Sequence, residues 1–176
     1  MYKMKRMRLP LKTELLKQLK AGNNVLLTGI IYTARDQAHK RLAEAINSGR
    51  RLLVNLKGQL IYYCGPTKTP AGKIIGSCGP TTSARMDSFT PALLKAGLKG
   101  MIGKGRRSEE VRAAIKKNKA VYFLTYAGCG ALLSQYVISA KPIAFKELGP
   151  EAIYKLEVRD FPLIVAIDTQ GRSIYD

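Results

Sequence analysis

The middle of this sequence alternates between segments typical of buried strands and segments with helical periodicity. Residues 25–32 are rich in β-branched and aliphatic side chains, which favours a buried strand. Apolar residues then recur at helical intervals until Ser48 and Gly49 end the pattern. Because both ends of the chain are rich in strand-like segments, the sequence predicts a layered α/β domain, with a mostly parallel central sheet and additional antiparallel strands.

The same reasoning places the other elements. Further strands are expected at residues 51–64, 74–75, 100–105, 121–125, 138–145, 152–158, 163–167 and 172–175, the last two as a hairpin. Helices are expected at residues 13–19, after Arg85, after a capping Ser108 and at 131–137. We expect Pro91 to kink or split the helix that follows Arg85.

The length favours one domain. At 176 residues, with 46% apolar side chains, the chain can bury a substantial core without disulfides or metals. We predict a single domain over residues 1–176, in which residues 1–12 form a basic arm that serves as a short edge strand or a docking segment.

Charge narrows the class of partner. The chain has 30 Lys and Arg residues against 12 Asp and Glu residues, a net charge of +18. A domain this basic usually binds something acidic, which includes nucleic acid, a membrane surface, an anionic metabolite or an acidic subunit. Composition does not choose among these.

The cysteines favour a reducing compartment. Cys64, Cys78 and Cys129 are odd in number and include no C-x-x-C pair, which argues against a disulfide scaffold and fits the cytoplasm. Three cysteines can hold an iron–sulfur cluster, but cysteines are commonly buried small hydrophobic side chains, and we favour that interpretation.

A membrane protein is not expected. Residues 1–8 are basic and no apolar segment follows, so they do not resemble a secretory signal. Residues 120–140 carry no charge and are about long enough to cross a bilayer, but their glycines and polar residues favour a buried strand followed by a helix.

Residues 77–85 are typical of an anion-binding turn. Gly79 and Pro80 predict a turn after a strand, and Thr81, Thr82 and Ser83 offer capping oxygens to a following helix. Free backbone N–H groups and the helix dipole attract anions at such a helix start, and Arg85 adds a cation on the same face. A carboxylate or a phosphate fits this turn.

Two further turns carry cations. Thr33 and Asp36 have the spacing of a capping box, which places Arg35 in the first turn of a helix. A cation there opposes the helix dipole, so it indicates a task other than stability. His39 is the single histidine, and a lone helical histidine is more commonly structural than catalytic.

Lys104 is the third cation, held between Gly103 and Gly105 after a strand, although the spacing is not that of a phosphate-binding P-loop. In open α/β sheets, turns at the carboxyl ends of strands converge. Three cations and two hydroxyls together would clamp a small dicarboxylate. These motifs contain no metal ligand set and no nucleophile with a base, so they make up half of an active site.

These motifs together resemble a known family. Residues 33–36 with Ala38 and His39, Gly65-Pro66, residues 79–82 with 85–87, and residues 103–105 are similar to the β subunit, or C-terminal domain, of class I fumarate hydratases and the related L(+)-tartrate dehydratases. The resemblance covers nearly the whole chain. Residues 126–130 depart from it, because we expect a glycine- and alanine-rich turn there without Cys129.

The resemblance implies a swivelling three-layer β/β/α domain. It would close over a [4Fe–4S] cluster held by three cysteines of a separate α subunit, in a heterotetramer, and this chain would bind no metal. The three cysteines of this chain would then be incidental.

The resemblance also assigns site residues. The family's substrate-binding residues fall on Arg35, Thr81, Thr82, Arg85 and Lys104. Thr81 is the candidate for proton transfer, and Lys104 is its catalytic neighbour. Because an unassisted threonine is a very weak base, Thr81 would need activation by Lys104, Arg85 or an α-subunit carboxylate.

Three functions stay open at this point. The first is reversible hydration of fumarate to (S)-malate. The second is dehydration of L(+)-tartrate to oxaloacetate, whose substrate differs by one hydroxyl group. The third is nucleic-acid binding, suggested by the charge alone, although the sequence has no RNA-binding motif or series of exposed aromatic residues.

Overall fold

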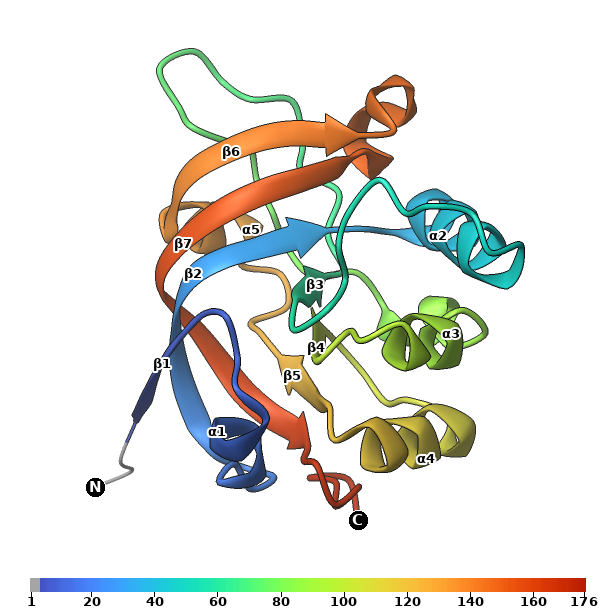
Figure 1. Cartoon of the computed structure of the whole chain (residues 1–176). Coiled ribbons are helices and arrows are strands. Elements are labelled where there is room, and N and C mark those ends of the chain that lie inside the picture. The colour runs from blue at the N-terminus through green and yellow to red at the C-terminus, as the bar shows by residue number, and fades with distance from the viewer. Residues whose placement is uncertain (1–3) are drawn as a thin grey trace.

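A ring of strands with helices along one side forms the body of the molecule in the computed structural model, which describes residues 4–176 (Figure 1). Four neighbouring strands run parallel: β2 (Asn24–Thr33), β3 (Leu60–Tyr62), β4 (Gly100–Gly103) and β5 (Val121–Leu124). The long strand β7 (Ile153–Ile167) is antiparallel to both β5 and β2, and so closes the ring. The fold is mixed α/β as predicted, but the closure of the sheet into a small barrel-like ring is new.

Two more strands extend this ring. β1 (Lys5–Arg8) lies parallel to β2 at an edge of the sheet, where the basic arm is expected to form an edge strand; residues 1–3 of that arm lie outside the described residues. β6 (Val137–Ala144) pairs antiparallel with β7. Among the described strands, parallel pairings (β1–β2, β2–β3, β3–β4, β4–β5) only slightly outnumber antiparallel ones (β2–β7, β5–β7, β6–β7).

The C-terminal strands differ from the prediction. We expected separate strands at 152–158 and 163–167, but β7 runs through both. Asp160, with a φ of 50°, bends the strand, and the pairing with β2 then resumes at Phe161, so the two halves remain one strand. Residues 172–175 are not a strand, and they meet β7 only through a bridge between Ser173 and Ile167.

Three helices line one side of the ring: α2 (Asp36–Asn47), α3 (Thr90–Lys95) and α4 (Glu109–Asn118) (Figure 1). The helix expected after Arg85 is α3, which follows the 3₁₀ turn η1 (Ser83–Met86). Pro91 lies in the first turn of α3, where proline is well tolerated, so it does not kink or split the helix as we expected. Ser108 caps α4, since its Oγ accepts from Val111 N at 3.2 Å.

The remaining helical segments are short. They are α1 (Thr13–Lys17), α5 (Gly130–Ser134) and the 3₁₀ segment η2 (Lys146–Glu151). The uncharged segment 120–140 forms β5, α5 and the start of β6, which confirms the predicted strand and helix. Within residues 4–176, no helix has the length and apolar character that crossing a membrane requires.

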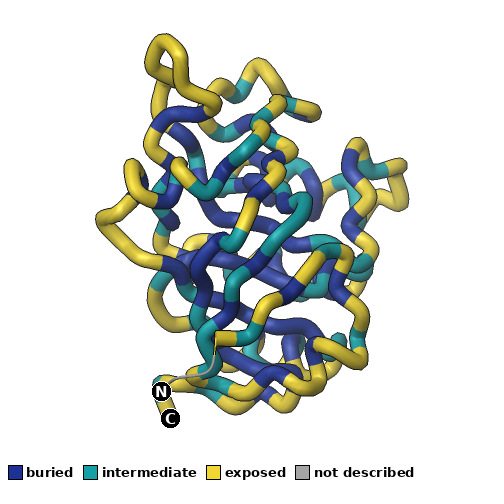
Figure 2. Tube along the Cα trace, turned by 90° about the vertical axis from the view of Figure 1, so that its left-hand side faces the viewer, coloured by how far each residue is buried: buried dark blue, intermediate teal, exposed yellow. Residues whose placement is uncertain are grey.

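The pleat of the strands separates two cores. On β3, Leu60 and Tyr62 pack in the ring with α1 and α5, whereas Ile61 packs with the helices on the outside. The inner core also contains Leu27, Ile102 and Phe123, and the outer core contains Leu42, Leu93 and Ile115. Figure 2 shows these buried segments gathered in the middle of the molecule, with the exposed loops around them. The ring thus gives the turns at its strand ends a fixed frame.

Candidate functional site

The start of α2 carries the first predicted cation. Arg35 is the N-cap residue with an extended backbone, not a first-turn residue as expected. Thr33 does not cap the helix either, because it belongs to β2 and its Oγ1 accepts from Tyr154 N at 3.0 Å. Glu151 Oε2 instead accepts from Gln37 N at 2.8 Å. A carboxylate from η2 therefore caps α2, a long-range contact that the local sequence does not encode.

The guanidinium of Arg35 lies against the backbone of Gly65. A Cβ at Gly65 would come within 2.8 Å of both Cδ and Nη1 of Arg35, so a glycine is needed for this close approach. Arg35 Nη2 is 3.9 Å from Glu151 Oε1, and Nε is 3.9 Å from Asp36 Oδ2. Nε is buried and has no hydrogen-bond partner among the described residues. Such a donor favours a ligand or water that accepts from it.

Arg85 joins the second turn to the first. Its Nε and Nη2 donate to Asp36 Oδ1 and Oδ2 at 3.0 and 2.6 Å, a bidentate pair. Burial raises the pKa of the Asp36 carboxyl, but the hydrogen bonds from Arg85 and the charges of Arg85 and Arg35 outweigh it and lower that pKa below 3.8. One ionised carboxylate therefore lies between two of the predicted cations.

Lys104 lies directly beside the predicted hydroxyls. Thr82 and Lys104 form a parallel bridge, Ser83 N donates to Lys104 O at 3.0 Å, and Lys104 N donates to Ser83 Oγ at 3.1 Å. A Cβ at Gly103 would lie 1.9 Å from Ser83 Oγ, so the glycine before the lysine permits this approach. The second and third predicted turns thus converge as expected.

The local structure of residues 77–85 differs from the prediction. Residues 74–75 are not a strand, and η1 has no side-chain cap from Thr82. Thr81 N donates to Tyr63 O at 2.7 Å, so the chain passes in extended form beside β3 before η1 begins. The two threonine hydroxyls are therefore not used as helix caps. All five predicted residues nevertheless belong to segments in mutual contact.

The sequence did not predict the buried positions of two polar residues beneath this surface, Ser83, which was expected only as a helix cap, and Arg107. Ser83 is buried, and the side chain of Arg107 is 0% exposed with its Nε 2.6 Å from Asp87 Oδ1. Nothing in the local sequence distinguishes Arg107 from the exposed Arg106 before it. The Asp87 partner lies 20 positions away, so only the folded chain identifies the pair.

His39 is structural in its surroundings, as expected. Burial lowers the pKa of its imidazole to about 4, so the ring is neutral near pH 7. Its Nδ1 lies 2.9 Å from Arg35 O, which assigns the ring proton to Nδ1 as a donor to that carbonyl. The ring meets Tyr63 edge-on, with 5.1 Å between centroids. His39 therefore holds the backbone carbonyl of Arg35 in place through this hydrogen bond.

Two of the three cysteines, Cys64 and Cys78, lie in contact with each other. Cys64 and Cys78 are buried and Cys129 is exposed, and all three are free thiols. A hydrogen bond with Cys78, together with burial, raises the pKa of the Cys64 thiol, which is therefore protonated. Within the described part of the chain, no three His, Cys, Asp or Glu side chains group as ligands for a metal. These residues do not fit an iron–sulfur cluster.

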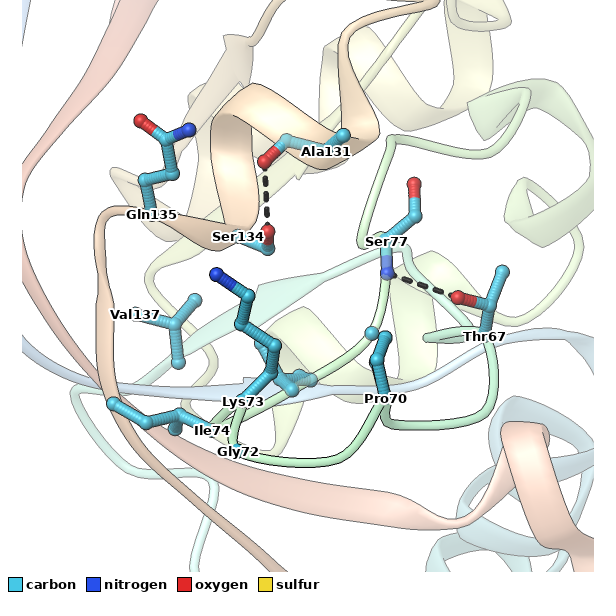
Figure 3. A pocket seen from close by; sticks show the side chains of 12 residues that line it. Thr67, Pro70, Gly72, Lys73, Ile74, Ser77, Ala131, Ser134, Gln135 and Val137 are labelled. Atoms are coloured by element: carbon cyan, nitrogen blue, oxygen red, sulfur yellow. Dashed lines mark hydrogen bonds between the residues drawn. The ribbon is translucent and has the colours of Figure 1, made fainter.

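A cavity of about 560 Å³ lies apart from the five residues (Figure 3). The loop of residues 67–77 and α5 form its walls, and Thr67 Oγ1 accepts from Ser77 N at 2.9 Å there. Its lining is largely apolar, with Lys73 as its one cation. By contrast, the predicted residues form an open surface, on which Thr82 and Arg85 are exposed. Of these two places, the open surface is the one that offers several cations, which suit a dicarboxylate.

Comparison with known proteins gives one consistent family. Residues 2–176 match the family described as the fumarase C-terminus. The chain is 41% identical over 162 residues to the anaerobic class I fumarate hydratase of Escherichia coli K12, covering 91% of this chain and 30% of that protein. It is 40% identical over 162 residues to fumarate hydratase 2 of Leishmania major, covering 91% of this chain and 28% of that protein.

A shorter relative has nearly the length of this chain. The Methanocaldococcus jannaschii protein named "Putative L(+)-tartrate dehydratase subunit beta" is 40% identical over 166 residues, which are 91% of this chain and 85% of that protein. The chain therefore spans less than a third of the two fumarate hydratases above, but most of a relative named as a separate subunit.

Proposed function

This chain belongs to the fumarase C-terminus family, and on that premise we propose that it is the β subunit of a two-subunit hydro-lyase that reversibly hydrates fumarate to (S)-malate. The observation that carries the proposal is the placement of Arg35 and Arg85 around Asp36, with the Thr82–Lys104 bridge in contact with the same segment. Two guanidiniums and an ammonium suit a substrate with two carboxylates.

Each residue has a proposed role in that reaction. Arg35 and Arg85 clamp the two carboxylates, and Arg35 has a buried Nε that still needs an acceptor. Thr82 and Lys104 complete the binding surface. Thr81 transfers the proton at carbon 3 of the substrate, and Lys104, Arg85 or a carboxylate of the partner subunit activates its hydroxyl, because a free threonine hydroxyl is a very weak base.

The rest of the active site belongs to a partner in this proposal. An α subunit binds the [4Fe–4S] cluster, which supplies a Lewis acid when bound, whereas this chain binds and orients the substrate. The subunits form a heterotetramer in the cytoplasm, and this domain swivels to close over the partner. The shared length with a relative named as subunit β supports a separate partner chain.

The second candidate substrate is L(+)-tartrate. The relative that this chain covers most fully among the three compared carries a tartrate dehydratase name, and that observation favours this alternative. Fumarate hydration and tartrate dehydration use the same carboxylate clamp. A single polar contact to the additional hydroxyl would select between them, and the partner subunit is free to supply it.

The test is a side-by-side assay of the assembled enzyme. The chain would be co-expressed without oxygen with the proposed α subunit, and loss of fumarate absorbance and formation of oxaloacetate from tartrate would be followed. We expect a higher kcat/KM for fumarate. A higher value for tartrate would establish the alternative, and a cluster-loaded complex that converts neither substrate would overturn both.

The charge of +18 also suggested nucleic-acid binding, which has no support beyond composition. The same preparation would decide it, because such binding weakens steeply and linearly on a log–log plot against salt concentration. We expect no binding to duplex DNA or single-stranded RNA at physiological salt.

A further inference from the structure

A buried cation, Arg107, lies beneath the segments that carry Thr81, Arg85 and Lys104. The Arg107 side chain is 0% exposed, and its guanidinium lies between the rings of Tyr63 and Tyr122, at 5.3 and 5.0 Å from their centroids. Nε donates to Asp87 Oδ1 at 2.6 Å and Nη2 to Thr90 Oγ1 at 2.7 Å. Burial of a charged guanidinium is costly, and these partners compensate that cost.

One route from Arg107 leads to Thr81. Arg107 Nη1 donates to the Tyr63 hydroxyl at 3.3 Å, and the guanidinium covers the ring of Tyr63. The carbonyl of Tyr63 accepts from Thr81 N at 2.7 Å. The residue that positions the Thr81 backbone is therefore itself held by Arg107.

A second route leads to Lys104. The Tyr122 hydroxyl lies 2.8 Å from Gly105 O and 2.9 Å from Ser83 Oγ. Since a phenol has one proton, Tyr122 donates to Gly105 O and accepts from Ser83, whose oxygen in turn accepts from Lys104 N. Burial raises the pKa of Tyr122, so the phenol keeps its proton. Because the Arg107 guanidinium stacks on the Tyr122 ring, it fixes the hydroxyl from which the hydrogen bonds to Ser83 and Lys104 start.

A third route leads to Arg85. Asp87 is the residue that ends η1, the turn that carries Arg85. The Asp87 carboxylate accepts from Arg107 Nε through Oδ1 and from Ser108 N, at 2.7 Å, through Oδ2. The Asp87–Arg107 pair thereby ties η1 to the segment that follows Lys104.

We propose that Arg107 is a positioning residue, which sets the separation between Thr81 and Lys104 without touching the substrate. This inference rests on the proposed function for its catalytic meaning. A residue that only balanced the charge of Asp87 would be replaceable together with it by a neutral pair. A positioning residue would not be replaceable in that way, and this difference defines the experiment.

The first measurement needs only the isolated chain. Amide hydrogen exchange would be followed by NMR at Thr81, Ser83 and Lys104 in wild type, R107M, the double variant D87N/R107M and the control R106M. Arg106 is exposed and stacks on Tyr175, away from these amides. We expect at least about tenfold faster exchange at the three amides in the double variant, with Val111 unchanged. Unchanged exchange at all three amides would overturn the proposal.

The second measurement uses the assembled enzyme. We expect R107M and D87N/R107M to lower kcat about 100-fold, the cost of a misplacement of about 1 Å, with KM within about threefold of wild type. R107K, which keeps the charge but loses the planar fork, should recover part of kcat, and R106M should match wild type. A stable double variant with wild-type kcat, or a rise confined to KM, would overturn the proposal.

The two measurements distinguish a failure of the proposed function from a failure of the positioning role of Arg107. An inactive wild-type complex would count against the proposed function, and the exchange measurement would still decide whether Arg107 positions Thr81 and Lys104. If R107M fails to fold because the partly buried Asp87 carboxylate is left without its partner, the double variant and R107K carry the test.

Discussion

Arg85 and Asp36, 49 positions apart in the sequence, form a two-point ion pair in which Nε and Nη2 of the arginine face both oxygens of the carboxylate. This contact uses one edge of the guanidinium. The end of the guanidinium that carries Nη1 is left for a second carboxylate, and the Arg85 side chain is 46% exposed. Asp36 therefore fixes the orientation of the Arg85 guanidinium, as the proposed carboxylate clamp requires.

Replacement of Arg85 tests the clamp directly. We expect Arg85→Ala to lower kcat/KM by more than tenfold, a loss on the order of a few kcal/mol of transition-state binding, because a charge-assisted bidentate contact is removed. The measurement is steady-state kinetics of the assembled enzyme with fumarate, with Arg106→Ala as the control. A loss below tenfold would remove Arg85 from the proposed clamp.

The Asp36 carboxyl predicts an acid dependence of stability. Its pKa in the folded chain is below 3.8, so its contribution is present above about pH 4 and disappears as the pH falls through the folded-state pKa. The side chain is 32% exposed, so we expect no more than about 1 kcal/mol. Urea unfolding at pH 6 and at pH 3 gives the free energy of unfolding at each pH. Between these two pH values, that free energy should fall less for Asp36→Asn than for wild type. Parallel decreases would contradict this expectation.

His39, the single histidine, predicts a second pH dependence of the unfolding free energy, at higher pH than that of Asp36. The folded-state pKa of His39 is about 4 and the unfolded value about 6.5, so the unfolded chain binds a proton first and stability falls as the pH drops from 6.5 to 4. The decrease is on the order of 3 kcal/mol. His39→Asn should remove this slope in urea unfolding. A titration of the imidazole by NMR with a midpoint near 6.5 would show the assignment to be wrong.

Gly103 is predicted to be intolerant of any side chain. Gly103→Ala places a methyl group 1.9 Å from Ser83 Oγ, so the Thr82–Lys104 bridge must open. We expect a loss of about 1–3 kcal/mol in unfolding free energy, as in other overpacked sites. Gly79→Ala is the matched control, since its Cβ would meet nothing closer than 3.4 Å. Equal effects of both substitutions on thermal unfolding would argue against the bridge as the cause.

Elements whose signal is local could be predicted from the sequence. β2 follows from its β-branched composition, and the start of α4 follows from Ser108, whose hydroxyl accepts from a backbone N–H three residues later. The convergence of Thr82 with Lys104 was also predicted, although the expected strand at residues 74–75 before Thr82 is absent and the two residues meet through an isolated parallel bridge.

Features that depend on distant partners could not be predicted. Thr33 has the spacing of a helix cap, but β7 takes its hydroxyl through Tyr154. The ring closure depends on β7 pairing with both β2 and β5, which no local pattern encodes. Arg107 is buried only because Tyr63, Asp87 and Tyr122 surround it, and these residues come from separate segments.

The ring closed by β7 also constrains how the chain is made. During synthesis, β2 emerges about 130 residues before β7, so one of its edges stays without a partner for most of translation. An open, apolar strand edge is a template for aggregation. Slow elongation or early termination before residue 153 would therefore expose β2, and chaperone demand should be concentrated in the nascent chain rather than in the finished domain.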